Sequence, residues 1–562
     1  MSMSERVADR FLALLRDEGV DRVFGNPGTT EVPMIEALSG ARDITYTLGI
    51  QEQAVVAMAD GHARTTGRPS FVNLHAGGGL SNGLIGMLNA LRSRTPMVVT
   101  AGQQDQRHLA YGPMLSADLV GLAQTAAKSA EQVHRAEDLP IVMRRAFALA
   151  RTAPYGPVFV SIPSELFGQD ATVGTPARTP RPGLGTADGI ERAAAVLAAA
   201  ERPAIIAGDR VGQGGAVAEL TAVAEALGAL VVPQPMFDAV NADSEHPLTA
   251  PMPLPLHAKV REVLDGHDVV LVAGATIRPH GYTPGSALPD GARVVQIDTD
   301  ASEIGRNWPA EVGLLGELAP TLAALAEELR GSGPNAARLA ERAGERASEI
   351  GGRQVAERDA WRAAARSRGS DVPGSLHPLA AAQLVADAIP DGATVVEEAI
   401  TTGKLLRRAL RMRKPGDFHH TVGGGLGWGI GTAVGARLAR ADRPVVALLG
   451  DGAAMFGVQG LWSAGHYGAP VTFVVFNNAE YRSPRQDGPG IDPEKLVGVD
   501  LTEPSIDWSH IAAGFGMNTV RVTRTDDVAP VIADATRADA PVLVEIPILG
   551  FVSERAQDRA GR

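Results

Sequence analysis

The stretch GDGAAMFGVQGLWSAGHYGAPVTFVVFNN, residues 450–478, decides the fold of this chain. The apolar runs at residues 444–449 and 471–476 are typical of buried parallel strands, and residues 453–467 between them indicate a helix. Parallel strands joined by a helix end at the same edge of a sheet, where ligands bind in α/β proteins. We therefore expect Asp451 and Asn478 to lie side by side at such an edge.

Asp451 and Asn478 have the chemistry of a magnesium and phosphate site. The glycines Gly450 and Gly452 let backbone amides approach a ligand closely, and the start of the following helix favours a phosphate. A carboxylate and an amide oxygen suit a Mg²⁺ ion that keeps its other positions for phosphate oxygens and water. A lone Gly-Asp-Gly turn is usually structural, but the flanking strands and the spacing to Asn478 favour a site here.

This unit resembles the diphosphate and Mg²⁺ motif of thiamine diphosphate enzymes. The resemblance implies that thiamine diphosphate and Mg²⁺ are the cofactors. It implies that the metal is held by Asp451, Asn478 and the backbone carbonyl of Glu480. The cofactor-binding residues that it implies are Glu52, Thr401, Gly424, Leu426, Gly450, Asp451, Gly452, Ala453, Asn478 and Tyr481.

Length and composition exclude several classes of protein. A chain of 562 residues is too long for one core and predicts about three or four domains. The net charge of −12 argues against nucleic acid and anionic membranes as partners, and the lack of cysteine excludes disulfides and thiol catalysis. No apolar run approaches the ~20 residues of a membrane span, and the N-terminus lacks the apolar core of a signal peptide. We therefore expect a soluble, cytoplasmic protein.

Three blocks of alternating strands and helices predict an α/β protein with three doubly wound parallel-sheet domains. The resemblance identifies these domains as pyrimidine-binding (residues 1–167), middle (187–330) and diphosphate-binding (376–562). In the middle block, residues 208–215 (GDRVGQGG) lack the spacing of a dinucleotide site, and we interpret them as a loop after a strand. The other expected strands lie at residues 44–48, 70–74, 97–101, 158–162, 203–207, 230–233, 269–273, 294–297 and 541–546.

Glu52 is the candidate acid–base residue. The thiazolium carbon of thiamine diphosphate loses its proton to the cofactor's own aminopyrimidine, which requires a carboxylate at the ring nitrogen. Glu52 begins a helix after the expected strand at residues 44–48, in YTLGIQEQAVVAMADGHA. A glutamate at a helix start is often only a partner of the helix dipole. Because the surrounding segment also resembles the pyrimidine-binding domain, we assign Glu52 as the activating carboxylate.

Leu426, in VGGGLGWGIG, is the candidate bulky residue that folds the cofactor so that its two rings meet. The surrounding glycines allow a backbone carbonyl, that of Gly424, to reach the aminopyrimidine amine. The alternative is a glycine-rich helix start that only packs against a strand.

His75 and His280 are candidates for proton transfer. His75 follows an expected strand in FVNLHAGGG, and His280 lies in TIRPHGYTPG, in a loop of the middle block. A histidine with a pKa near 7 moves protons in both directions, whereas a lone histidine is more often structural. Decarboxylation needs such a group, because the enamine left after loss of CO₂ must be protonated.

The segments GNPGTTE (residues 25–31) and AGQQ (101–104), with Glu52, His75 and His280, resemble the benzoylformate decarboxylase branch of the thiamine diphosphate-dependent 2-oxo acid enzymes. The resemblance implies a carboxy-lyase that converts a 2-oxo acid to an aldehyde without oxidation. It places Thr29 where a serine binds the substrate carboxylate. It also implies a homo-oligomer, at least a dimer and usually a tetramer, with Glu52 of one subunit and Asp451 of another at each site.

The expected substrate pocket departs from that branch. His420, Pro484 and Asp487 take the places of large apolar residues, and Glu398-Ala399-Ile400 replaces hydroxyl residues near the diphosphate. The sequence therefore predicts that the substrate is a 2-oxo acid with a polar side chain. Arg482 and Arg485 lie in the same segment as Pro484 and Asp487 and could reach a polar or anionic group on that substrate. The expected pocket residues are Thr29, His75, Met114, Leu115, His280, His420, Pro484 and Asp487.

Two other functions would use the same cofactor. A carboligase of the acetohydroxyacid synthase type would join the enamine to a second carbonyl compound, although the two histidines favour protonation and thus decarboxylation. A cofactor-binding protein without turnover is disfavoured by the presence of Glu52, Asp451 and Asn478.

Overall fold

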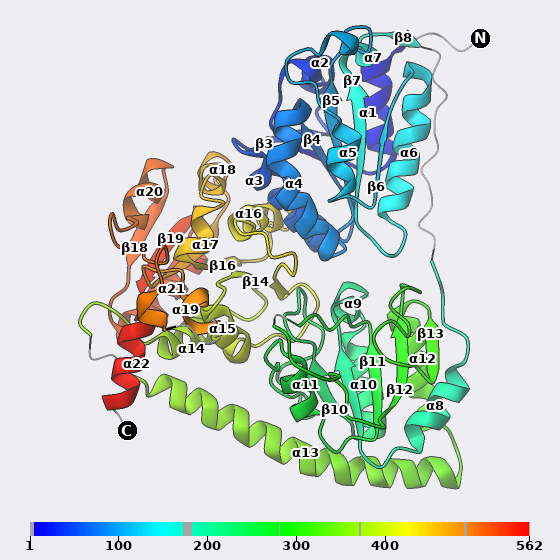
Figure 1. Ribbon diagram of the computed structural model, residues 1–562, viewed down its shortest axis with the longest axis vertical. Helices are drawn as coiled ribbons and strands as arrows, with labels where there is room; N and C mark the ends of the chain where they lie inside the picture. The colour runs from blue at the N-terminus through cyan, green and yellow to red at the C-terminus, as the bar shows by residue number, and fades with distance from the viewer. Residues whose placement is uncertain (1–4, 172–182, 280, 370–371, 488–491, 561–562) are drawn as a thin grey trace.

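The computed structural model describes residues 5–171, 183–279, 281–369, 372–487 and 492–560. It contains three sheets of parallel strands, each flanked by helices (Figure 1), so the expected three α/β domains are confirmed. No described helix is long and apolar enough to cross a membrane.

The N-terminal sheet has the strand order β3-β2-β4-β5-β7-β6, and neighbouring strands pair in parallel. Alternate residues of its central strands enter two separate cores, because helices cover both faces. The strands are β2 (Arg22–Gly25), β3 (Thr45–Leu48), β4 (Ser70–Leu74), β5 (Met97–Gln103), β6 (Ser129–Gln132) and β7 (Pro157–Pro163), and a short antiparallel pair joins β1 (Glu5–Arg6) to β8 (Asp170–Ala171). The helices are α1 (Val7–Asp17), α2 (Val32–Ser39), α3 (Glu52–Thr66), α4 (Ala76–Arg92), α5 (Leu119–Gln124), α6 (Leu139–Ala150) and α7 (Ser164–Phe167).

The middle sheet has the order β10-β9-β11-β12-β13, also all parallel. Its strands are β9 (Pro203–Ala207), β10 (Leu230–Pro233), β11 (Val269–Ala273), β12 (Arg293–Asp298) and β13 (Val312–Leu315). Its helices are α8 (Ile190–Ala198), α9 (Asp209–Gln213), α10 (Val217–Leu227), α11 (His257–Val263) and α12 (Leu318–Arg330). The interpretation of residues 208–215 as a loop was wrong in part, since α9 begins directly after Gly208.

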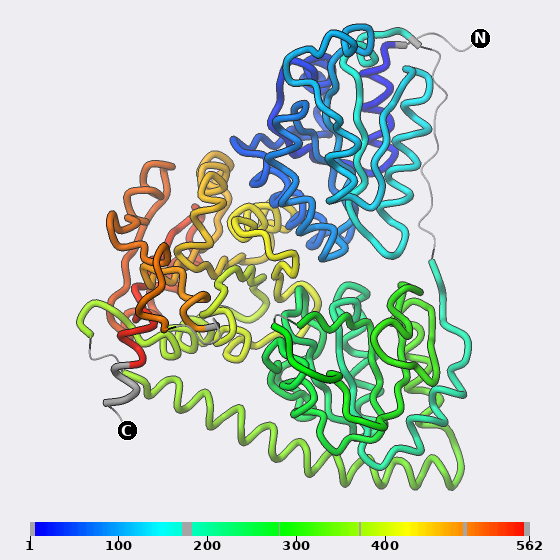
Figure 2. Tube along the Cα trace, in the orientation of Figure 1, coloured from blue at the N-terminus to red at the C-terminus, as the bar shows by residue number. Residues whose placement is uncertain are grey.

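A single long helix, α13 (Pro334–Arg366), runs from the middle domain to the C-terminal domain along one side of the molecule (Figure 2). Most of its side chains are exposed. Near its C-terminal end, Arg362 forms an ion pair with Glu245 of the middle domain at 2.6 Å. The C-terminal end of α13 is therefore still in contact with the middle domain.

The C-terminal sheet has the order β15-β14-β16-β17-β19-β18, with every pair parallel. Its strands are β14 (Thr394–Glu398), β15 (Phe418–His419), β16 (Val445–Gly450), β17 (Val471–Asn477), β18 (Asn518–Arg521) and β19 (Val542–Pro547). Its helices are α14 (Pro378–Ala388), α15 (Thr402–Ala409), α16 (Gly429–Ala439), α17 (Asp451–Met455), α18 (Gly460–His466), α19 (Arg482–Asp487), α20 (Trp508–Gly514), α21 (Thr525–Arg537) and α22 (Phe551–Ala560).

The single helix expected at residues 453–467 was wrong. The structure divides it into α17 and α18, with a turn at residues 456–459. Gly457 lies in this turn against the backbone of Gly427, and a Cβ atom on Gly457 would lie 2.2 Å from the Gly427 carbonyl oxygen. Only glycine therefore fits at this point of the turn.

Helices α3 and α16 dock the N-terminal domain on the C-terminal domain through a contact of small residues. A Cβ atom on Gly435 would lie 1.8 Å from the carbonyl oxygen of Met58, and one on Gly61 would lie 2.1 Å from that of Thr432. Beside this contact, the buried indole of Trp428 donates a hydrogen bond to Asp60. The two backbones approach so closely that no side chain fits between them.

We expect the substitution Gly435→Ala to destabilise the protein by about 1–3 kcal/mol or more, because the added methyl group must push α3 and α16 apart. Thermal or urea unfolding measures the effect. Gly344→Ala in α13 is the matched control, since a Cβ atom at Gly344 would have no neighbour within 4 Å, and alanine there is expected to stabilise the helix by about 0.5–1 kcal/mol. Equal unfolding midpoints for the two variants would contradict the tight contact.

Candidate active site

A cavity of about 540 Å³ lies between the middle and C-terminal domains. Its walls follow the carboxyl ends of strands from both sheets, which is the usual binding edge of parallel α/β folds. The lining residues are 234–236, 276, 278–279, 398–402, 420–422, 424–426, 450–453, 476, 478 and 480–484.

Asp451 and Asn478 lie together at this edge because β16 and β17 are neighbours, with Gly450 opposite Phe476. Asp451 is 3% exposed, and one of its carboxylate oxygens accepts a hydrogen bond from the Ala479 amide at 2.9 Å. Burial raises the pKa of Asp451 to about 7. A nearby cation would stabilise the ionised form of this buried carboxylate. The oxygen atoms of Asp451 and Asn478 therefore fit a divalent metal.

Glu480 and Tyr481 complete this wall. The Glu480 carboxylate accepts a hydrogen bond from the Phe551 amide at 2.6 Å and pairs with Arg485 at 3.1 Å. Its side chain is thus held by α22 and α19, which leaves its backbone as the part available to a metal. Tyr481 packs so closely over Gly452 that a Cβ atom there would lie 2.6 Å from the ring. The close approach of Tyr481 therefore requires glycine at position 452.

The glycine stretch that carries Leu426 is held by side chains from the N-terminal domain. The Asn89 amide forms two hydrogen bonds with the backbone of Gly425, at 2.8 and 3.0 Å. The Gln53 side chain donates to the carbonyl of Leu426. Gly424 adopts a φ of 80°, which is the left-handed region that favours glycine.

Glu398 anchors the same stretch from the other side. Its carboxylate accepts hydrogen bonds from the amides of Trp428 and Gly429, at 3.0 and 2.9 Å. Burial raises its pKa to about 8. From the sequence alone, Glu398 was noted only as a difference from the family. Its position at the carboxyl end of an apolar run could have predicted that it lies at the site. Thr401 and Thr402 follow it and also line the cavity.

Glu52 lies outside this cavity within one chain. It begins α3, is 8% exposed, and accepts hydrogen bonds from the side-chain amides of Asn26 and Asn82 at 3.1 and 3.0 Å. The residues that line the cavity belong to the middle and C-terminal domains alone. The structure therefore does not bring Glu52 and Asp451 together on a single chain.

His75 lies near Glu52 in the N-terminal domain, since both side chains are next to Gly79. Its Nδ1 atom lies 2.8 Å from a carboxylate oxygen of Glu31 and 3.1 Å from the hydroxyl of Thr30. Glu31 is fully buried and also accepts from the amides of Gly28 and Gly102, each at 3.0 Å. Glu31 thus fixes the imidazole and leaves Nε2 as its outward atom. Sequence reasoning quoted Glu31 as the last residue of the segment GNPGTTE but gave it no role.

The remaining N-terminal candidates are exposed. Thr29 is exposed, and Met114 and Leu115 are 84% and 44% exposed. Leu115 accepts a hydrogen bond from the Gly77 amide at 3.3 Å, which places this loop next to the start of α4 and His75. Thr29, Met114 and Leu115 are thus exposed on the N-terminal domain and do not line the cavity.

Of the other expected pocket residues, His420 and Pro484 line the cavity. The His420 Nδ1 atom lies 2.9 Å from the Glu397 carbonyl, and Arg407 lies beside the ring. Burial, reinforced by Arg407, lowers the pKa of His420 well below its usual value, so the ring is neutral. His280 lies outside the described residues, as does the side chain of Asp487, whose backbone ends α19.

The two arginines of the same segment are already paired. Arg482 forms an ion pair with Glu554 of α22. Arg485 pairs with Glu480 at 3.1 Å and with Asp500 at 2.5 Å. In contrast, Arg278 lines the cavity and forms no hydrogen bond or ion pair with a described residue.

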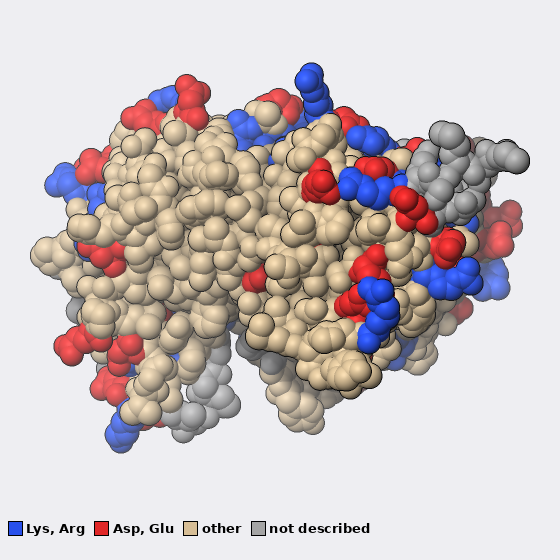
Figure 3. Space-filling model, turned by 90° about the horizontal axis from the view of Figure 1, so that it is seen from above, with Lys and Arg blue, Asp and Glu red and all other residues tan. Residues whose placement is uncertain are grey.

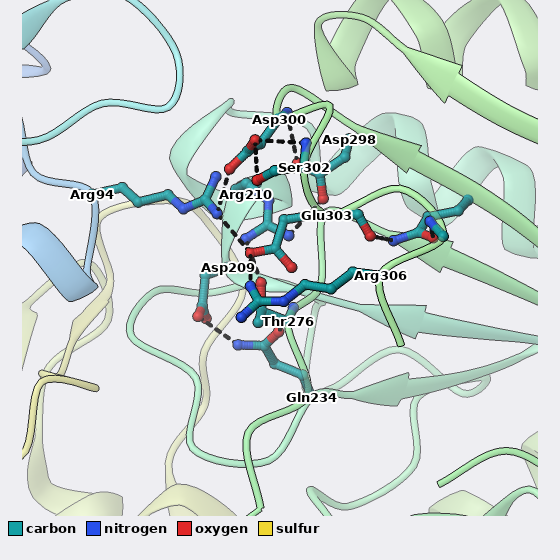
Figure 4. Close-up of polar contacts among 12 residues, drawn as sticks. Arg94, Asp209, Arg210, Gln234, Thr276, Asp298, Asp300, Ser302, Glu303 and Arg306 are labelled. Carbon is teal, nitrogen blue, oxygen red and sulfur yellow. Dashed lines mark hydrogen bonds and ion pairs between the residues drawn. The ribbon is translucent and has the colours of Figure 1, made fainter. Parts of the chain in front are cut away.

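Side chains fill the carboxyl edge of the middle sheet (Figure 4). Arg210 pairs with Asp298 at 2.5 Å and donates to the Thr276 hydroxyl at 3.1 Å. Arg94 reaches this edge from the N-terminal domain and pairs with Asp300 and Glu303 at 2.9 and 3.0 Å.

Comparisons with known proteins agree with this architecture. Three family models match in chain order: the N-terminal binding domain of thiamine pyrophosphate enzymes over residues 5–130, their central domain over 190–325 and their C-terminal binding domain over 401–546. These domains support thiamine diphosphate as the cofactor.

Individual relatives cover nearly the whole chain. Benzoylformate decarboxylase of Pseudomonas aeruginosa is 32% identical, with 95% of this chain and 97% of that protein covered. The acetolactate synthase isozyme 2 large subunit of Escherichia coli is 27% identical, with 95% and 94% covered. The solved thiamine diphosphate-dependent 4-hydroxybenzoylformate decarboxylase of Rhodococcus jostii is 30% identical, with a TM-score of 0.85 over 97% and 99% of the two chains. This chain belongs to the family of thiamine pyrophosphate enzymes.

Proposed function

We propose that the protein is a Mg²⁺-dependent decarboxylase that converts a 2-oxo acid to an aldehyde and CO₂. The observation that carries the proposal is the cavity at the joined carboxyl edges, where the buried Asp451 and the half-buried Asn478 lie beside the glycine stretch of Leu426. When bound there, thiamine diphosphate supplies the nucleophilic carbon that makes the bond to the carboxylate breakable. The bond between the oxo carbon and the carboxylate breaks, CO₂ leaves, and a proton takes its place.

Within this proposal, each wall of the cavity has a task. Asp451, Asn478 and the Glu480 carbonyl would hold the metal, and Gly452, Ala453 and Thr401 would bind the diphosphate. Leu426 and the Gly424 carbonyl would position the two rings of the cofactor. The described contacts of Asn89, Gln53 and Glu398 keep this wall in place.

We further infer that a complete site requires two copies of the chain. Glu52 and His75 are absent from the cavity walls of their own chain, yet both belong to ordered polar clusters. On the face shown in Figure 3, most of the surface carries no Lys, Arg, Asp or Glu side chain. Large apolar side chains are exposed, among them Ile50, which lies two residues before Glu52, and Tyr111, Met114 and Phe456. Such surface is typical of contacts between subunits.

With Glu52 supplied by a second copy, His75 faces the substrate. The Glu31 carboxylate holds Nδ1, so Nε2 delivers the proton that replaces CO₂. Proton delivery at this step gives an aldehyde. A carboligase would instead join the same intermediate to a second carbonyl compound. The similarity to an acetolactate synthase makes this reaction the alternative.

The substrate is proposed to carry a polar group. Burying a phenyl ring is favourable only where no polar group loses water beside it. Arg278 lines the cavity without a hydrogen bond or ion pair to a described residue, and His420 lines it too. The two relatives with decarboxylase names act on benzoylformate and 4-hydroxybenzoylformate, and the hydroxylated acid is the better match to this lining.

A panel of 2-oxo acids tests the proposal. We expect CO₂ and aldehyde in equal amounts, and a higher kcat/KM for hydroxylated or acidic 2-oxo acids than for benzoylformate. The panel is run with and without acceptor aldehydes, and CO₂ and organic products are both measured. Ligated products without free aldehyde would identify a carboligase. A preference for benzoylformate above ~100-fold, or about 2.7 kcal/mol of transition-state binding, would contradict the polar pocket.

A further inference from the structure

Met236 lines the active-site cavity from the middle domain in a backbone conformation that methionine rarely adopts. Pro235 and Met236 form a turn directly after β10, and the φ of Met236 is 55°. Proline is common at the second position of a turn, whereas a positive φ at the third position favours glycine or asparagine. A strained residue beside a ligand cavity often serves the function of that cavity.

The turn is held in this conformation from both ends by Asp209, which is 4% exposed. One carboxylate oxygen of Asp209 accepts a hydrogen bond from the Gln234 side chain (Figure 4), and the other accepts from the Asp238 amide at 2.9 Å. The Asp238 carbonyl in turn accepts from the amide of His420 in the C-terminal domain at 3.0 Å. The surrounding structure therefore fixes the backbone of Met236, as the strained φ requires.

The Met236 side chain extends from the middle domain to the C-terminal domain. Its sulfur atom lies 3.6 Å from Nη1 of Arg407 in α15. Nη2 of the same guanidinium group lies 3.1 Å from Nε2 of His420, and the Arg407 side chain is 1% exposed. Because Met236 and His420 both line the cavity and both contact this buried arginine, the thioether belongs to the same part of the cavity as His420.

A smaller cavity, of about 50 Å³, lies next to this part of the active-site cavity. Its lining includes Phe237, the next residue in the chain, and Arg407, the contact partner of Met236. Since Met236 lines the larger cavity and Arg407 lines the smaller one, their contact lies in the partition between the two. Shortening Met236 to alanine would remove three atoms, Cγ, Sδ and Cε, from this partition.

We propose that Met236 is a specificity-determining residue whose thioether limits the length of the substrate side chain on the middle-domain side of the cavity. This role rests on the proposed function, because it concerns the substrate of the same site. A side chain that closes a pocket excludes longer substrates by steric overlap, and one methylene group changes kcat/KM by roughly 10–200-fold. Methionine suits the role because it is apolar and fills irregular gaps.

A homologous series of 2-oxo acids, each lengthened by one methylene group, tests the proposal. We expect Met236→Ala to raise kcat/KM for the longer acids, relative to the shortest acid accepted, by at least ~10-fold. Met236→Leu keeps an apolar side chain of similar volume and should keep the original preference. Met236→Gly should accept longer acids as Met236→Ala does and unfold at a higher temperature, because glycine adopts a φ of 55° without strain.

Met252→Ala is the matched control, because Met252 is a half-buried methionine of the middle domain that does not line the active-site cavity. Its replacement should leave the length preference unchanged. Calorimetry also measures binding of the same acids to Glu52→Gln protein loaded with thiamine diphosphate and Mg²⁺, with and without Met236→Ala. This measurement makes selection by length visible without turnover.

An unchanged length preference in Met236→Ala, in both kcat/KM and binding, would overturn the role of Met236. An equal broadening of the preference by Met252→Ala would overturn it as well. If the unmodified protein turned over none of the acids while Met236→Ala still broadened the range of lengths that bind, the proposed function would fail and the role of Met236 would stand.

Discussion

Replacing Glu52 with glutamine is expected to lower turnover by at least ~10²-fold, the effect of losing a positioned acid–base group. The substitution keeps the size of the side chain and an acceptor for one of the two amides of Asn26 and Asn82, while the other amide must turn its oxygen toward the new NH₂ group, so the fold should survive. What disappears is the negative charge proposed to act on the cofactor's aminopyrimidine. Steady-state kinetics measure the effect.

Exchange of the cofactor's C2 proton separates this role from a structural one. We expect exchange to slow together with turnover in Glu52→Gln. The control is Glu311→Gln, which removes an exposed carboxylate that pairs with Arg293 in the middle domain. If C2-proton exchange in Glu52→Gln matched that of the unmodified protein, another group would have to activate the cofactor.

Replacing Asp451 with alanine is expected to abolish cofactor binding at ordinary concentrations. The diphosphate and the metal are proposed to bind as one unit, so loss of the metal ligand should weaken thiamine diphosphate by at least ~10²-fold, or about 2.7 kcal/mol. Equilibrium binding of the cofactor, with and without a chelator, measures the loss. Chelation should release cofactor from the unmodified protein as well.

Asp442→Ala is the matched control for this experiment. Asp442 lies just before β16, is exposed, and pairs with Arg440 at 2.8 Å. Its replacement should leave cofactor affinity unchanged. An Asp451→Ala protein with full affinity for thiamine diphosphate would contradict the assignment of residues 450–478 as the cofactor motif.

The strands of the three sheets were predictable where apolar runs are continuous. Four predicted strands coincide with β4, β9, β10 and β11, and the others differ at their ends by one or two residues. Parallel strands covered on both faces have such runs because every side chain is buried. The strands that the sequence did not reveal are short or polar, as in β6 (SAEQ) and β18 (NTVR), both at sheet edges.

The sequence predicted which residues lie at the candidate site, but it did not predict the side chains whose hydrogen bonds keep the site in place. Asp451 and Asn478 stand at the ends of recognisable strands, so their proximity followed from the topology. The contact of Asn89 with Gly425 joins residues 336 positions apart, and no local pattern marks it. The turn between α17 and α18 likewise packs on a residue far away in the sequence, Gly427. Long-range packing decides these features.

We propose that one active site combines Glu52 of one chain with Asp451 of another. The most direct test is to measure the decarboxylase activity of oligomers formed from Glu52→Gln and Asp451→Ala chains, each inactive by itself. In a mixed dimer, one site has an intact Glu52 and an intact Asp451, so random mixing should restore about a quarter of the normal activity. Mixed oligomers with no more activity than the separate variants would show that both residues must act from the same chain.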